Sequence, residues 1–259
     1  MRNKTFQGDI NLFKDKLNNK ENFAFTRYSD GELYILKGLE LKLSNGTIQI
    51  GDKEQYGPYQ SQEFKHFDPK IHNEFRDKLI EAFQFKSENY FKGISCRCCM
   101  PEEDFKYQLE LHGGDDDSLT WSNLFVNANY YKFVFEILPI FYSRKVVFVG
   151  HHDADISKLP YVVKDFRVGY NAMINDYNVI NEMKEWIKQN DIKDHIFLFS
   201  ASTFSNLAIY ELFKEFKNNT YLDIGTCLTP MMNMPTERHY IQEFWYGIPL
   251  RDLKKVCIW

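Results

Sequence analysis

Two carboxylates separated by a single glycine follow an apolar stretch near the start of the chain. They are Asp30 and Glu32, in the segment TRYSDGE. On a tight turn both side chains can face one cation, because Gly31 lets the backbone approach closely, and hard carboxylate oxygens suit Mn²⁺ or Mg²⁺. Such an ion would neutralise a diphosphate leaving group as a Lewis acid, and Arg27 would add a second positive charge. The alternative is structural, with Asp30 capping a helix and Glu32 in its first turn.

A second polar group, GHHDAD, follows the apolar stretch KVVFVG. Transfer of a group to a hydroxyl needs a base that takes the proton, and His152, Asp153 and Asp155 have side chains of that kind. The alternative is a polar loop at the end of a strand. The segment HGGDDDS is also acidic, but three aspartates after two glycines are more typical of a solvated loop than of a metal site.

Buried strands and amphipathic helices alternate through the second half of the chain. The predicted strands are KVVFVG, YVVKDFRV, HIFLFS and TYLDIG, with helices over 178–189 and 204–216. This alternation is typical of a parallel sheet covered on both faces, so we predict the α/β class: one domain, 1–259, with a Rossmann-like, mostly parallel sheet flanked by helices. Ligands bind beyond the carboxyl ends of such strands. We therefore expect five segments at one edge: 27–32, 151–155, 169–172, 200–203 and 223–226.

The first half of the chain is less regular, and its elements are predicted one by one. We expect a helix from Asp9, a strand over 23–26 and a short helix over 30–36 that ends at Gly38. A long loop or hairpin near the site should cover 39–67, with a turn in SNGTIQIG. The remaining predictions are a helix from Asp68 to Phe85, a strand over 93–99, a helix over 127–138 and a C-terminal extension over 226–259.

Charge and composition exclude several classes of protein. The formal net charge is −4 and no dense run of Lys or Arg occurs, so nucleic acid is an unlikely partner. No apolar stretch approaches the roughly 20 residues that span a bilayer, and the first residues lack the apolar core of a signal peptide, so we expect a cytoplasmic protein. The five cysteines are odd in number, which argues against a disulfide framework. Gly-x-Gly-x-x-Gly, Walker and Gly-x-Ser-x-Gly motifs are absent.

Several separated segments, in the right order, resemble the GT-D-type glycosyltransferase family, formerly a domain of unknown function. The family carries a metal-binding Asp-x-Glu in the context Arg-x-x-Asp-Gly-Glu, matched here by Arg27, Asp30, Gly31 and Glu32. RVGYNAMINDYNVI resembles a family strand-to-helix element, matched by Asn171, Ala172 and Tyr177. IFLFSASTFSNLAIYELFK resembles its strand, small-residue turn and helix, and YLDIG its closing Asp-Ile-Gly strand. The resemblance covers about 23–225.

Two positions depart from the family pattern. Thr226 follows Asp-Ile-Gly where many members have His, and Ala201 with Ser202 replaces a usual Gly-Pro. The second change keeps a small-residue turn, so the following helix could still offer backbone N–H groups to a phosphate.

The resemblance implies a metal-dependent glycosyltransferase of the hexosyltransferase type. It would move a sugar from a nucleotide-diphosphate sugar, with UDP-sugar favoured, to a hydroxyl of a glycan, glycoprotein or other acceptor. Mn²⁺ or Mg²⁺ would be held by Asp30 and Glu32, which are also expected catalytic residues together with Asp153 and Asp155. The expected donor-binding residues are Arg27, His152, Asn171, Ser200, Ser202, Thr203 and Asp223.

Two other functions stay open at this stage. A metal-dependent nucleotide-sugar hydrolase or phosphoesterase would use the same carboxylates to activate water. A non-catalytic nucleotide- or carbohydrate-binding module would need Asp30 and Glu32 only to begin a helix.

Overall fold

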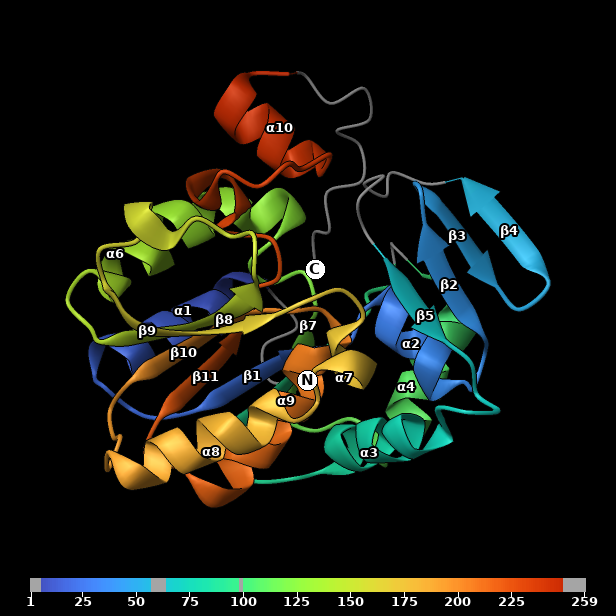
Figure 1. Cartoon of the computed structure of the whole chain (residues 1–259), viewed down its shortest axis with the longest axis horizontal. Helices are drawn as coiled ribbons and strands as arrows, with labels where there is room; N and C mark the ends of the chain where they lie inside the picture. The colour runs from blue at the N-terminus through green and yellow to red at the C-terminus, as the bar shows by residue number, and fades with distance from the viewer. Residues whose placement is uncertain (1–5, 57–63, 98–99, 249–259) are drawn as a thin grey trace.

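The computed structural model describes residues 6–56, 64–97 and 100–248, and its centre is a seven-stranded sheet (Figure 1). Every neighbouring pair of strands is parallel. The strand order is β7 (Leu119–Trp121), β6 (Tyr90–Ile94), β1 (Ala24–Arg27), β11 (Thr220–Asp223), β10 (Ile196–Ser200), β8 (Val146–His151) and β9 (Val162–Val168). The predicted α/β class with a parallel sheet flanked by helices is confirmed.

Helices cover both faces of this sheet, which explains why inner strands such as β8 and β10 are apolar along nearly their whole length. On one face lies α1 (Phe6–Asn18), whose Phe13 ring packs 5.0 Å from that of Phe23 and 5.1 Å from that of Phe25, between centroids. On the other lie α3 (Asn73–Gln84), α8 (Val179–Gln189) and α9 (Thr203–Glu215) (Figure 1). Phe213 of α9 contacts Tyr221 of β11 on that side.

The range 39–67 contains a separate antiparallel sheet. Its strands, in order, are β4 (Lys53–Tyr56), β3 (Thr47–Ile50), β2 (Leu41–Ser44) and β5 (Lys65–Phe67). The hairpin expected at SNGTIQIG joins β2 to β3, and Asn45 and Gly46 in its turn both have positive φ. Leu41 and Phe67 are buried in the common core, so this small sheet packs beside α2 (Asp30–Leu36) (Figure 1). Residues 57–63 of the range lie outside the described residues.

Several predicted boundaries differ from the structure. The opening helix begins at Phe6, ahead of Asp9, which is buried and accepts a hydrogen bond from Thr120. Helix α3 begins at Asn73, because the Asp68 carboxylate accepts from the Lys70 N–H and closes a turn first. The strand expected over 93–99 is β6, which ends earlier, and positions 98 and 99 lie outside the described residues.

The helix expected over 127–138 is present but interrupted. It is built from η1 (Asn127–Asn129), α5 (Tyr130–Lys132), the π-helical η2 (Phe133–Ile137) and α6 (Leu138–Phe141). Pro139 has no N–H to donate and its ring crowds the carbonyl four residues earlier, so the turn before it widens.

The remaining elements are all helical. They are α4 (Glu102–His112), η3 (Ile156–Lys158), α7 (Ala172–Asn175), η4 (Thr229–Met232) and α10 (His239–Tyr246). Across the described ranges, no helix combines the length and apolar character needed to cross a bilayer.

Candidate functional site

A cavity of about 610 Å³ opens at the carboxyl ends of the parallel strands. All five segments expected at this edge contribute to its wall, so the sequence placed them correctly relative to one another. From them, the lining residues include Arg27, Asp30, Glu32, Asp153, Asn171, Ser200, Ser202, Thr203 and Asp223. From β1 the chain adds β6 and then β7 on one side of the sheet, whereas β8 to β11 all lie on the other side of β1. The direction of strand addition therefore changes between β1 and β11. A crevice between β1 and β11 is therefore the expected binding position.

Arg27 and Asp223 face each other across this crevice from the ends of the two strands. Nη1 of Arg27 lies 3.8 Å from Oδ1 of Asp223, and Nε of Arg27 donates to the Ser122 carbonyl. Oδ1 of Asp223 also accepts from the Gly225 N–H at 3.0 Å. The guanidinium is therefore fixed at the base of the cavity with part of its surface still exposed to a ligand.

Gly225 leaves the space that Arg27 occupies. Its φ is +51°, and a Cβ at this position would lie 2.1 Å from Nη1 of Arg27. Both the backbone conformation and the close approach require glycine. The Asp-Ile-Gly motif thus has a physical role, since its aspartate and its glycine together position the arginine of the first motif.

Burial raises the pKa of Asp223 to about 6, although Arg27 lowers it. The residue is only 6% exposed, and the nearby charge of Glu32 acts in the same direction as burial. Ionised Asp223 is therefore held in the folded protein at a cost in stability, as at many functional sites.

The substitution Asp223→Asn is expected to raise the free energy of unfolding by up to about 3 kcal/mol above pH 6. The folded-state pKa of Asp223 lies above its ordinary value of 3.8, so the wild type loses stability as pH rises from about 4 to about 6. A neutral amide does not titrate, so the gain should vanish near pH 4. Urea unfolding at about pH 4 and about pH 7.5 measures the difference, and an equal gain at both would show that ionisation is not its cause.

Asp30 is the first residue of helix α2, and it lines the cavity. Oδ1 accepts from the Gly31 N–H at 3.0 Å and from the Ser29 hydroxyl at 3.3 Å. For Oδ2, no protein partner occurs among the described residues. One oxygen of this carboxylate is thus available to a ligand.

Glu32 is engaged on both of its carboxylate oxygens. Oε2 accepts from the Ser29 N–H at 3.1 Å and completes a capping box for α2. Oε1 accepts from the Thr203 hydroxyl at 3.1 Å and lies 3.5 Å from Nζ of Lys65. Burial raises the pKa of Glu32, but Lys65 and the hydrogen bonds from Ser29 and Thr203 outweigh it and the net shift is downward. The side chain is ionised, buried and paired.

The predicted metal pair therefore fits only in part. Mn²⁺ or Mg²⁺ needs carboxylate oxygens at about 2.0–2.2 Å. Asp30 can supply one, but Oε1 of Glu32 would have to exchange the Lys65 ammonium for the ion. In this arrangement Asp30 fits a metal and Glu32 does not, and the alternative that Glu32 sits in the first turn of a helix describes its contacts better.

The small-residue turn after β10 brings Ser200 and Ser202 into the wall. Ser202 precedes the 13-residue helix α9, and its hydroxyl accepts from Lys65 at 3.2 Å. The first N–H groups of α9 have no carbonyl partner within the helix and carry partial positive charge, so they can receive an anion.

Asn171 connects the large sheet to the small one. Its Oδ1 accepts from the His66 N–H at 3.1 Å, and its Nδ2 donates to the His66 carbonyl at 2.9 Å. Each end of the amide makes one hydrogen bond in this clamp and keeps capacity for another. Asn171, expected to bind the donor, lines the cavity and also holds β5 against it.

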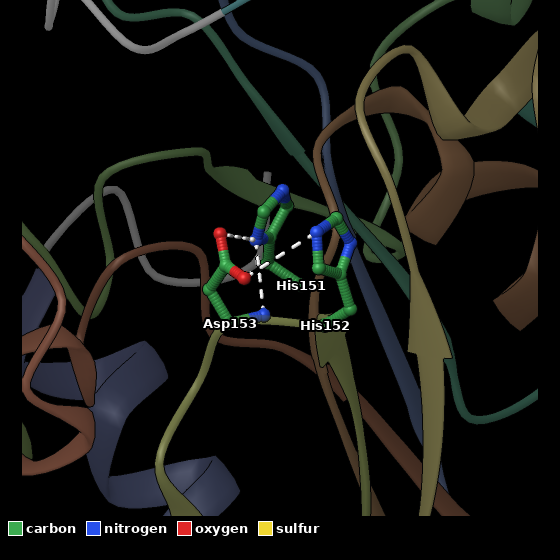
Figure 2. A group of neighbouring side chains, drawn as sticks. All are labelled: His151, His152 and Asp153. Atoms are coloured by element: carbon green, nitrogen blue, oxygen red, sulfur yellow. Dashed lines mark hydrogen bonds and ion pairs between the residues drawn. The ribbon is translucent and has the colours of Figure 1, made fainter.

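His151, His152 and Asp153 cluster at the end of β8 (Figure 2). Oδ2 of Asp153 lies 3.5 Å from Nδ1 of His151, and Oδ1 lies 3.4 Å from Nε2 of His152. Burial, together with His152, lowers the pKa of His151, so this ring is neutral at pH 7. Within the described ranges this is the only group of at least three His, Cys, Asp or Glu side chains close enough to share an ion. Asp153 and His151 line the cavity, whereas His152 does not.

Asp155 lies outside the cavity wall. Its carboxylate accepts from the Ser157 N–H at 2.9 Å, which caps η3, and from the Asn233 amide at 2.8 Å. Its contacts are those of a loop residue, and the predicted catalytic role finds no support in its position.

Several lining residues received no role from the sequence patterns. Ser29 and His151 lie in segments expected at this edge, whereas Lys65, Arg238 and Tyr240 do not, and all five line the cavity. Arg238 and Tyr240 come from the range expected as a C-terminal extension, and Tyr240 contacts the Thr226 hydroxyl. His151 was expected at this edge within 151–155, but Lys65 stands in a segment without periodicity or motif.

Comparison with known proteins gives matches at the level of structure. No family model and no curated protein matches the sequence. A solved glycosyltransferase of domain of unknown function 1792 from Streptococcus sanguinis is 15% identical, with a TM-score of 0.55 over 92% of this chain and 84% of that one. A structure of the highly conserved domain of unknown function 1792, which has a distinct glycosyltransferase fold, is 13% identical, with a TM-score of 0.50 over 95% and 91% of the two chains. At these identities the fold is what is shared, and it is the fold of the family that the motifs resemble.

Proposed function

We propose that this chain, whose fold is that of the domain-1792 glycosyltransferase structures, transfers a sugar from a nucleotide-diphosphate sugar to an acceptor hydroxyl. The observation that carries the proposal is the convergence of Arg27, Asp30 and Asp223 on one cavity at the crevice between β1 and β11. Fold likeness alone does not assign an activity, because one fold hosts many functions. A UDP-sugar is the favoured donor, and the acceptor is a glycan, a glycoprotein or another hydroxyl compound.

The donor's phosphates are placed near the Arg27 guanidinium and the start of α9. Arginine binds phosphate oxygens through paired N–H groups, and its charge offsets the negative charge that grows on the leaving diphosphate. Asp223 orients Arg27 from 3.8 Å, and Gly225 leaves room for that orientation. The predicted Mn²⁺ or Mg²⁺ stays a prediction, with Asp30 as the residue free to bind it.

Asp153 is the best-placed base for the acceptor. Its carboxylate is largely exposed and lies beside the stacked rings of His151 and His152, within 3.5 Å of a nitrogen of each (Figure 2). An acceptor hydroxyl that reached it could pass its proton to the carboxylate as the new bond to the sugar forms. The neighbouring histidines would then stabilise or relay that proton.

A donor that occupies this cavity is expected to raise the melting temperature. At about 100 times its Kd, a ligand that binds only the folded protein adds about 2.7 kcal/mol of stability. UDP-, GDP-, CDP- and dTDP-sugars should be screened by thermal shift, with and without Mn²⁺. Product analysis of each stabilising donor, with and without candidate acceptors, then tests for transfer.

Three outcomes would contradict the proposal. Free sugar released at full rate without an acceptor would indicate a hydrolase. Binding without turnover, across a broad set of acceptors, would indicate a binding module. No shift with any donor would remove the nucleotide-sugar assignment.

A further inference from the structure

We propose that Lys65 binds the distal phosphate of the donor's diphosphate, and that the role of Glu32 is to hold this ammonium. The inference rests on the proposed function and assigns a residue that no sequence motif contains. Lys65 reaches the cavity from β5 of the small sheet, and its side chain is 13% exposed there.

The ammonium contacts two groups, and neither saturates it. Nζ lies 3.2 Å from the Ser202 hydroxyl and 3.5 Å from Oε1 of Glu32. Charge-assisted N–H···O bonds are ordinarily about 2.7–2.9 Å long, so both contacts are loose. An ammonium has three N–H donors, and these two acceptors are its partners in the part of the chain that the structure describes. The group therefore has capacity for a further anionic acceptor.

Its position matches that of a phosphate subsite. Ser202 precedes α9, whose first N–H groups are without helical partners. A Cβ built on Gly31 would lie 3.3 Å from Nζ, so glycine gives the ammonium space beside the start of α2. A phosphate here would meet an ammonium, a hydroxyl and the positive end of a helix at once.

The backbone around Lys65 is fixed, so the charge is held in place before a ligand arrives. The two hydrogen bonds between the Asn171 amide and the His66 backbone clamp the next residue of β5. On the other side, Lys65 pairs with Leu43 in the β2–β5 ladder. A positioned charge needs little rearrangement when the diphosphate leaves the sugar.

The contacts of Glu32 support the same assignment. Its two oxygens already accept from Ser29, Thr203 and Lys65, and its side chain is about 10% exposed. A divalent ion on Oε1 would lie next to the ammonium, where like charges repel. Glu32 is therefore a positioning residue for Lys65.

The test compares binding of UDP and UMP, with GDP and GMP in parallel, by calorimetry in EDTA and in Mn²⁺. Lys65→Ala is expected to weaken binding of the diphosphate about tenfold in both conditions, because one charge-assisted contact is lost. Binding of the monophosphate should change less than twofold. Lys65→Arg should retain most of the affinity. Lys42→Ala, on the exposed face of the neighbouring strand β2, should match the wild type.

The results separate failure of this inference from failure of the proposed function. Unchanged diphosphate affinity in Lys65→Ala would overturn the inference alone. Equal losses for UDP and UMP would also overturn it, because they would indicate a general change of the cavity. If neither these nucleotides nor any donor of the thermal-shift screen binds the wild type, the proposed function fails and the inference fails with it.

Discussion

Replacing Asp30 with asparagine is expected to lower sugar transfer about 100-fold and to remove its response to added Mn²⁺, with little change in the free energy of unfolding. Asp30 is the cavity-lining carboxylate at the start of α2, and an amide of the same shape keeps the contacts of Oδ1 to Gly31 and Ser29. Only the negative charge and its affinity for a cation are lost. Initial rates over a Mn²⁺ titration, with urea unfolding of the same samples, measure both parts.

Glu32→Gln is the matched variant, because it removes a charge two residues away. It should retain the Mn²⁺ response and lose about 1 kcal/mol of stability, since Glu32 completes the α2 capping box and pairs with Lys65. If both variants lose the response, the two carboxylates hold the ion together and the assignment of Glu32 to Lys65 is wrong. A wild-type rate in Asp30→Asn would exclude Asp30 from the reaction.

Replacing Gly225 with alanine is expected to weaken donor binding about 10- to 100-fold by displacing Arg27. The new Cβ would lie 2.1 Å from Nη1, so the guanidinium must leave its place beside Asp223. Loss of a charge-assisted contact to phosphate costs about 1.5–3 kcal/mol of binding, which gives this range. Calorimetry with the donor found by the thermal-shift screen measures the effect.

Gly51→Ala is the control that separates the effect of the Cβ contact with Arg27 from the effect of the left-handed backbone conformation. Gly51 has a similar positive φ of +55°, but no atom lies within 4 Å of a Cβ built there. Both variants should therefore lose about 1–2 kcal/mol of stability from the left-handed conformation, and only Gly225→Ala should lose affinity. Equal affinities in the two variants would show that Arg27 does not bind the donor.

The large sheet was predictable because its signal is local. Strands buried on both faces must be apolar throughout, as KVVFVG and HIFLFS are, and their alternation with helices implies parallel pairing. Parallel strands put all their carboxyl ends on one edge, so the segments that end in Arg27, Ser200 and Asp223 had to meet. The boundaries were less predictable, since Asp68 closes a turn with its side chain and delays α3.

The partners of the charged side chains were decided only by the tertiary structure. Sequence gives Asp30 and Glu32 the same chemistry, and both line the cavity, but the second oxygen of Asp30 has no partner among the described residues whereas Glu32 is held by Thr203 and Lys65. Lys65 is 33 residues from Glu32 along the chain, and Asn171 is 105 residues from His66. Contacts over such separations depend on how two sheets pack.

Residue types and their order along the chain therefore determined the α/β class, the edge of the sheet that carries the site, and the chemical groups available there. The tertiary structure decided which of those groups are free. A side chain can donate to or accept from a ligand only with the oxygens or N–H groups that are not already hydrogen-bonded to a neighbour. Burial and nearby charges shift its pKa and so set the pH range in which it is charged. Asp223 and Glu32 show both effects, since the same crevice raises the pKa of one carboxylate and, through Lys65, lowers that of the other.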